Sequence, residues 1–300
     1  MEPRHGTYRG LGVDGFHDLH YTDWGRRNSR RVIVCAHGYS GNARDFDFIA
    51  AELARDARVI CIDVAGRGES AWLASPVGYH FGQFVADIHA LLAHLELKEV
   101  DWLGTSMGGL LGLMLASQPS SPIRRLVMND VGAFLPIEAL QAIARNLEAP
   151  ESFATIEEVE AHMRHTHRDW GTISDAQFRH LAIHGSRKDA SGFRLHFDPA
   201  IARVARPMPF SPGLFFWDAW YRVRCPVLLL RGEHSEVFPE AVANTMLDIK
   251  PGARLVEIPG CGHVPALMSA AEIGVVRNFL RGVPSQKDEP RQRPDTARAA

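Results

Sequence analysis

The feature that most constrains how this 300-residue chain can fold is a serine enclosed by glycines, in Gly-Thr-Ser-Met-Gly-Gly at residues 104–109. An apolar run at residues 100–103 leads into it, and an apolar, helix-like segment at residues 110–117 follows it. Ser106 therefore stands where a strand turns directly into a helix, which requires a strained backbone and neighbours without bulky side chains. Its hydroxyl is a candidate nucleophile. The amide of Met107, at the helix N-terminus, is a candidate donor to a developing negative charge.

Composition narrows the class of protein further. With 46% hydrophobic residues, the chain can bury a core that suits one large α/β domain with an insertion, or two modest domains. A formal net charge of −2 gives no electrostatic reason to expect nucleic acid or a membrane as a partner. No apolar run approaches the ~18 residues of a membrane span, and the first residues lack the apolar core of a secretory signal. We expect a cytoplasmic protein with a small-molecule substrate, and the sequence leaves its oligomeric state open.

Histidines and cysteines raise the question of a metal site. None of the four cysteines forms a C-x-x-C pair, so we expect reduced thiols that pack as small apolar groups. Five of the 15 histidines lie within residues 162–184, and His180 and His184 have the spacing of two ligands on one helix. The surrounding acidic and polar residues, and the lack of a metalloprotease-type glutamate between the two, favour a solvated helical face. We therefore expect no metal and no organic cofactor.

Strand-like and helix-like segments alternate along most of the chain, which predicts parallel βαβ units. An N-terminal hairpin is expected to turn at Asp14-Gly15. Apart from the serine motif and its flanks, strands are expected at residues 31–36, 58–62, 123–128, 226–230 and 254–258, and helices at residues 46–54, 81–95, 239–249 and 269–281.

The alternation stops between residues 133 and 224, where the segment is mostly helical and shows no convincing buried strand. Capping boxes at Thr155 and Ser174 begin two of its helices. Because the ligand crevice of an open parallel sheet lies beyond the strand ends, such an insertion predicts a cap over that crevice. We expect a core of residues 1–132 and 225–283, a helical cap of residues 133–224 and a disordered tail of residues 284–300. The aromatic residues of the cap fit either an apolar pocket or the core of the cap itself; they are Trp170, Phe193, Phe197, Phe215, Phe216, Trp217 and Trp220.

Two other loops carry groups that acyl transfer requires. His263 lies in the glycine-rich loop after the last predicted strand, from which an imidazole can reach the Ser106 hydroxyl as general base. His37 and Gly38 directly follow the strand at residues 31–36. The backbone N–H of the next residue, Tyr39, can then join that of Met107 in holding an oxyanion.

Taken in order, these motifs resemble those of cap-bearing α/β-hydrolases. The resemblance spans residues 8–282 and rests on His37-Gly38, Asp63-x-x-Gly66-x-Gly68-x-Ser70, the Gly-x-Ser-x-Gly turn, Asp130 and Gly262-His263. It implies an α/β-hydrolase fold, with a mostly parallel central sheet flanked by helices and a helical cap inserted between two late strands. It also implies a catalytic triad of Ser106, His263 and a carboxylate.

The carboxylate has two candidates. The commonest family pattern has aspartate at the position that Ser235 occupies here, and Glu236 is the next residue along the chain. Some relatives instead draw the acid from the end of an earlier strand, where this chain has Asp130. We favour Asp130 and keep Glu236 as the alternative. A purely structural role for Asp130, as the cap of a turn, stays open.

The resemblance favours a serine hydrolase that cleaves a small carboxylic ester through an acyl-enzyme. Serine at the nucleophile position argues against dehalogenase and epoxide hydrolase relatives, which use aspartate there. The main alternative is a hydrolase of carbon–carbon bonds in ring-cleavage products, which has the same triad. A non-catalytic member that uses the fold as a binding module is a further alternative, which an intact Ser106 and His263 disfavour.

Overall fold

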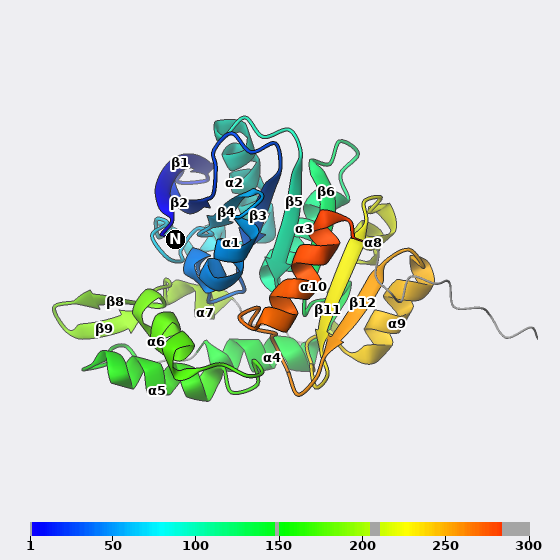
Figure 1. The fold of residues 1–300 in the computed structure, drawn as a ribbon. Helices are drawn as coiled ribbons and strands as arrows, with labels where there is room; N and C mark the ends of the chain where they lie inside the picture. Colours follow the sequence, from blue (N-terminus) through cyan, green and yellow to red (C-terminus); the bar gives the residue numbers. More distant parts are fainter. Residues whose placement is uncertain (1, 148–149, 205–210, 284–300) are drawn as a thin grey trace, which may run out of the picture.

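An eight-stranded sheet in the order β1-β2-β4-β3-β5-β6-β11-β12 organises the molecule (Figure 1). The computed structural model describes residues 2–147, 150–204 and 211–283. The sheet strands are β1 (Arg4–Gly12), β2 (Gly15–Trp24), β3 (Val32–Ala36), β4 (Arg58–Ile62), β5 (Val100–Thr105), β6 (Ile123–Asn129), β11 (Val227–Gly232) and β12 (Arg254–Ile258). Strand β2 pairs antiparallel with β1 and with β4, whereas the remaining neighbours are parallel. The N-terminal hairpin and the mostly parallel sheet expected from the sequence are confirmed.

Helices cover both faces of this sheet. They are α1 (Asp47–Leu53), α2 (Phe81–His94), α3 (Met107–Ala116), α8 (Trp217–Arg222), α9 (Glu240–Ile249) and α10 (Ala270–Arg281), with short 3₁₀ turns η1 (Ala43–Phe46) and η2 (Pro76–Gly78). Successive strand residues point to opposite faces. Val34 accordingly joins the apolar cluster under α2 and α3, whereas Cys35 joins the cluster under α1 and α10. Burial on both faces explains why the parallel strands read as unbroken apolar runs.

The segment between β6 and β11 is an insertion, because these two strands are neighbours in the sheet. Its elements before α8 are β7 (Phe134–Pro136), α4 (Ile137–Asn146), α5 (Ile156–Thr166), α6 (Asp175–His184), β8 (Ser186–Asp189), β9 (Gly192–Leu195), α7 (Ala200–Val204) and β10 (Gly213–Phe215). In Figure 1 the green elements α4, α5 and α6 gather below the sheet.

The insertion is mostly helical, but it also contains short strands that the sequence analysis did not predict. Strands β7 and β10 form one antiparallel pair, and β8 and β9 form another. Each of these strands is only three or four residues long and at most partly buried, as the half-exposed β9 illustrates. They therefore lack the apolar run that marks a buried strand in a sequence. The expected disordered tail, residues 284–300, lies outside the described residues.

None of the helices within the described ranges combines the length and apolar character needed to cross a bilayer. The four cysteines are free thiols.

The last helix of the insertion, α8, packs on α3, and its Trp220 is fully buried in the larger apolar cluster. The Trp220 indole donates to the Met246 carbonyl at 3.1 Å. Trp220 is therefore a residue of the main hydrophobic core.

Candidate active site

The turn between β5 and α3 places Ser106 in a backbone conformation that few residues adopt. Its φ of 50° and ψ of −114° lie outside the regions favoured by side-chain-bearing residues. A Cβ on Gly104 would lie 2.1 Å from the carbonyl oxygen of Gly108, and a Cβ on Gly108 would lie 1.9 Å from that of Ala36. Both positions therefore require glycine. The turn is fixed further by a hydrogen bond from the Ser106 N–H to the Asn129 carbonyl at 2.8 Å.

The structure brings Ser106, His263 and Asp130 together in one chain of contacts. The Ser106 hydroxyl oxygen lies 3.0 Å from Nε2 of His263, which stands on the loop after β12. On the other side of the ring, Nδ1 of His263 lies 2.7 Å from Oδ2 of Asp130, directly after β6. This arrangement allows the imidazole to accept the hydroxyl proton while the carboxylate holds the opposite N–H.

Asp130 is held from several sides and is fully buried. Its Oδ1 accepts a hydrogen bond from the Gly232 N–H at 2.8 Å, and its Oδ2 accepts from the Ser235 hydroxyl at 2.6 Å. Ser235 occupies the position at which the commonest family pattern has its aspartate. Here its hydroxyl donates instead to Asp130, which follows a different strand. Glu236 is exposed and, within the part of the chain that the structure describes, makes no contact with His263.

The loop after β3 meets the serine turn through His37. Its carbonyl accepts from the Gly108 N–H at 3.1 Å, and its buried Nε2 accepts from the Val64 N–H at 3.0 Å. Burial lowers the pKa of His37 to about 4, so the ring is a neutral structural acceptor. Among the described residues, the N–H groups of Tyr39 and Met107 donate no hydrogen bond to another protein group. Both remain free to bind an oxyanion.

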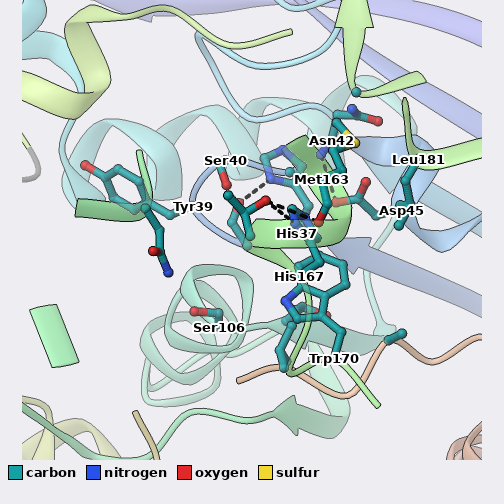
Figure 2. Close-up of a pocket in the computed structure, with 18 of the residues that line it drawn as sticks. His37, Tyr39, Ser40, Asn42, Asp45, Ser106, Met163, His167, Trp170 and Leu181 are labelled. Atoms are coloured by element: carbon teal, nitrogen blue, oxygen red, sulfur yellow. Dashed lines mark hydrogen bonds between the residues drawn. The ribbon is translucent and has the colours of Figure 1, made fainter. Parts of the chain in front are cut away.

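The cavity beside Ser106 is enclosed by the core and the insertion together (Figure 2). Side chains from the insertion that line it are Ile143, Asn146, Leu147, His162, Met163, Thr166, His167, Trp170, Leu181, Leu195 and Phe197. Figure 2 shows His167 and Trp170 across the cavity from Tyr39, and the rings of His167 and Trp170 are tilted at 52° with centroids 3.9 Å apart. Burial lowers the pKa of His167 to about 4, with a smaller effect from nearby His162. The cavity therefore combines apolar walls with polar groups, among them the neutral ring of His167.

Two groups near the site escaped the sequence analysis. Nδ2 of Asn129 donates to the Pro265 carbonyl at 2.9 Å and to the Thr105 hydroxyl at 3.2 Å, which ties the His263 loop to the serine turn. Its place beside Asp130 at a strand end was the available signal. The Gly262 N–H donates to the backbone carbonyl of Asp169 at 2.6 Å. A backbone contact of this kind between core and insertion has no sequence signal.

The histidine-rich stretch divides among different surroundings. His162 and His167 line the cavity, and His165 is exposed. The expected solvated face is wrong for His180, whose ring packs against Phe48 of the core with centroids 5.0 Å apart. Of the aromatic residues singled out in the insertion, Trp170 and Phe197 line the cavity, and the others do not.

Comparison with known proteins agrees with this architecture. A model of the alpha/beta hydrolase family matches residues 33–274. A curated relative, 3-hydroxybutyrate-oligomer hydrolase from Cupriavidus necator, is 37% identical over 292 residues, covering 93% of this chain and 98% of the relative.

Solved structures resemble the chain over nearly its whole length. An alpha/beta hydrolase from Novosphingobium aromaticivorans is 30% identical with a TM-score of 0.84, covering 93% of this chain and 98% of the other. A Rickettsia typhi protein is 27% identical with a TM-score of 0.86, covering 94% and 99%. The insertion therefore lies within the matched region rather than outside it.

Proposed function

The chain belongs to the alpha/beta hydrolase family, and from that premise we propose that it is a serine hydrolase that cleaves a small carboxylic ester through an acyl-enzyme. The observation that carries the proposal is the continuous path from the Ser106 hydroxyl through His263 to Asp130, with contacts of 3.0 and 2.7 Å. In this proposal these residues are nucleophile, general base and orienting acid.

The reaction proceeds in two halves. Nε2 of His263 takes the hydroxyl proton as the Ser106 oxygen attacks the ester carbonyl, and Asp130 stabilises the imidazolium that forms. The N–H groups of Tyr39 and Met107 hold the oxyanion. His263 then gives its proton to the departing alcohol, which leaves the acyl group on Ser106. Water attacks this acyl-enzyme with His263 again as base. His263 then returns that proton to the Ser106 oxygen as the acid is released.

We propose further that residues 133–224 act as a cap that selects the substrate. Supporting this, side chains from α4, α5 and α6 enclose the cavity beside Ser106, and the insertion touches the His263 loop through Asp169. Groups that surround the acyl and alcohol parts, but not the reacting carbonyl, change substrate choice more than the chemical step.

The proposed substrate class is a short oligoester of a hydroxy acid. Supporting this, the relative named for hydrolysis of 3-hydroxybutyrate oligomers shares 37% identity over nearly the full length of both chains. Such oligomers alternate apolar carbons with ester groups. The cavity offers both apolar walls, such as Leu147 and Phe197, and neutral polar side chains, such as Asn146 and Thr166.

A substrate panel tests this proposal and separates it from carbon–carbon bond hydrolysis. Purified protein is given the dimer and trimer of 3-hydroxybutyrate, p-nitrophenyl butyrate and a vinylogous diketone ring-cleavage product. We expect kcat/KM for the trimer to exceed that for p-nitrophenyl butyrate by about tenfold, because more of the substrate contacts the cavity. Turnover of the diketone without ester hydrolysis would contradict the proposal. The Ser106→Ala variant serves as the blank for every substrate.

A further inference from the structure

A cluster of metal-ligating groups lies outside the catalytic path, where α6 of the insertion faces η1 and α1 of the core. His180 and His184 are four residues apart on α6, so their side chains share one face of the helix. Asp47, the first residue of α1, lies opposite them. One ligand atom from each of these three residues lies within 4.8 Å of the other two. The cluster therefore spans the junction between core and insertion.

The three residues lie close enough to share one ion. Nε2 of His180 lies 3.3 Å from Oδ2 of Asp47 and 3.2 Å from the backbone carbonyl oxygen of Arg44. The imidazoles of His180 and His184 lie side by side, with ring centroids 4.4 Å apart. These groups can meet at one ion if the His180 ring turns away from the Arg44 carbonyl.

A buried oxygen of Asp47 lacks a partner among the described residues, which is a second observation that favours a ligand at this cluster. Asp47 is only 7% exposed. Its Oδ2 accepts hydrogen bonds from the Arg44 guanidinium, at 2.7 Å from Nε, whereas its buried Oδ1 has no hydrogen-bond partner within the part of the chain that the structure describes. A buried acceptor without a partner is costly. In metal sites, an outer donor commonly holds one part of a carboxylate ligand while another part binds the ion.

The charges around the cluster suit a cation despite the presence of Arg44. Asp47 supplies a carboxylate, and the two histidines supply ring nitrogens. The guanidinium of Arg44 lies on the Oδ2 side of Asp47, with Nη2 at 2.6 Å. Neutral imidazole and ionised carboxylate are the forms that bind metals.

We propose that Asp47, His180 and His184 bind a divalent transition-metal ion, with Zn²⁺ as the type, and that the ion fastens α6 to the core. His180 binds through Nε2, which then gives up its contact with the Arg44 carbonyl, so that the ring proton is on Nδ1. Water completes the coordination. His184 also lines a surface depression together with His5, His20 and His196, which gives the ion access from solvent. The ion takes no part in the chemistry at Ser106, so this proposal is independent of the proposed function.

Calorimetry and thermal unfolding of the tag-free, EDTA-treated protein test the proposal. We expect one Zn²⁺ bound per chain and a rise in Tm of about 5 °C at a 100-fold excess of zinc over its Kd. His180→Gln and His184→Gln should each abolish the rise, while the Tm without metal changes little because glutamine keeps a polar side chain at both positions. His165→Gln, on the exposed face of α5, is the matched control and should keep the rise.

Arg44→Met sharpens the test, because it removes the guanidinium that holds Oδ2 of Asp47. We expect this variant to bind Zn²⁺ about tenfold more tightly than the unmodified protein, by loss of like-charge repulsion. Co²⁺ titration provides a second readout, since a tetrahedral site with nitrogen and oxygen ligands gives a visible absorption band. The proposal is overturned if zinc does not raise the Tm of the unmodified protein. It is equally overturned if the rise survives in the His180→Gln/His184→Gln double variant.

Discussion

The core and the insertion line the same cavity, but they differ in how firmly their residues are held. In the core, Asp130 is fully buried and accepts hydrogen bonds from Gly232, Ser235 and His263. In the insertion, α5 and α6 contribute to a small apolar cluster that also includes Met268 of the core, and lining residues such as Trp170 are only half-buried.

This difference separates two tasks. A group held from several sides keeps its geometry, which a reacting centre requires to within a fraction of an ångström. Half-buried side chains on short elements can be replaced with less consequence for the fold. We infer that the core fixes the reaction and the insertion sets which substrate reaches it. Substitutions of the core residues at the site should therefore reduce turnover of every substrate. Substitutions in the insertion should instead change the relative turnover of different substrates.

The largest expected effect is that of Ser106→Ala. Ester hydrolysis should fall by ~10⁴-fold or more, leaving only the contribution of the oxyanion donors and binding. The Tm should change little, because alanine fits the same turn. Ser117→Ala, at the other end of α3, is the matched control and should keep its activity. If the Ser106→Ala variant hydrolysed esters within tenfold of the unmodified rate, Ser106 would not be the nucleophile.

Separate substitution of the two candidate acids should give nearly as large a difference in turnover. Asp130→Asn should lower kcat by ~10⁴-fold, because the amide favours the wrong tautomer of His263. Glu236→Gln should cost less than about tenfold, because the exposed Glu236 makes no contact with the imidazole. Steady-state kinetics on one soluble ester measure both. The reverse ranking would move the orienting acid to Glu236.

A smaller and substrate-dependent effect is expected in the insertion. Trp170→Ala should change kcat/KM for a hydroxy-acid trimer by about tenfold and that for p-nitrophenyl acetate by less than about threefold. The control is Phe215→Ala, an aromatic residue of the same insertion that is 58% exposed and lies away from the cavity. Equal losses on both substrates in Trp170→Ala would show that the insertion affects the reaction itself.

The smallest effect concerns pH and the wall of the cavity on the core side. Burial raises the pKa of Asp45 to about 7 from a usual value of 3.8. The folded protein thus keeps a proton that the unfolded chain loses, so this residue lowers stability as pH rises from about 4 to about 7. Asp45→Asn should therefore gain Tm relative to the unmodified protein across that window. Asp18→Asn, at an exposed position, is the control, and its Tm difference from the unmodified protein should not vary with pH. A pH-independent Tm difference for Asp45→Asn would contradict the raised pKa of Asp45.

The core was largely predictable from the sequence because its demands are local. A Cβ at Gly104 or Gly108 would lie less than 2.5 Å from backbone atoms, so both positions require glycine. The apolar strands are buried on both faces. Asp130 and Glu236 could not be separated with the same certainty. The choice depends on which strand end lies beside His263, and the residues in contact are 133 positions apart in the chain.

The insertion was less predictable for a physical reason. Its strands β8 and β9 are short and half-exposed, so they lack the alternation or apolar run that identifies a strand. The orientation of His180 and His184 toward the core likewise depends on how α6 docks against η1. Helical spacing alone shows that the two residues share a face, but not what that face meets.

The central claim is that Ser106 is the nucleophile, and covalent labelling measures this most directly. Protein treated with a fluorophosphonate and digested should carry a single adduct on the peptide containing Ser106, because the His263 and Asp130 contacts activate that hydroxyl alone. The adduct should be absent in Ser106→Ala and formed at an unchanged rate in Phe215→Ala. Labelling of another residue, or ester hydrolysis that continues in fully labelled protein, would contradict the account.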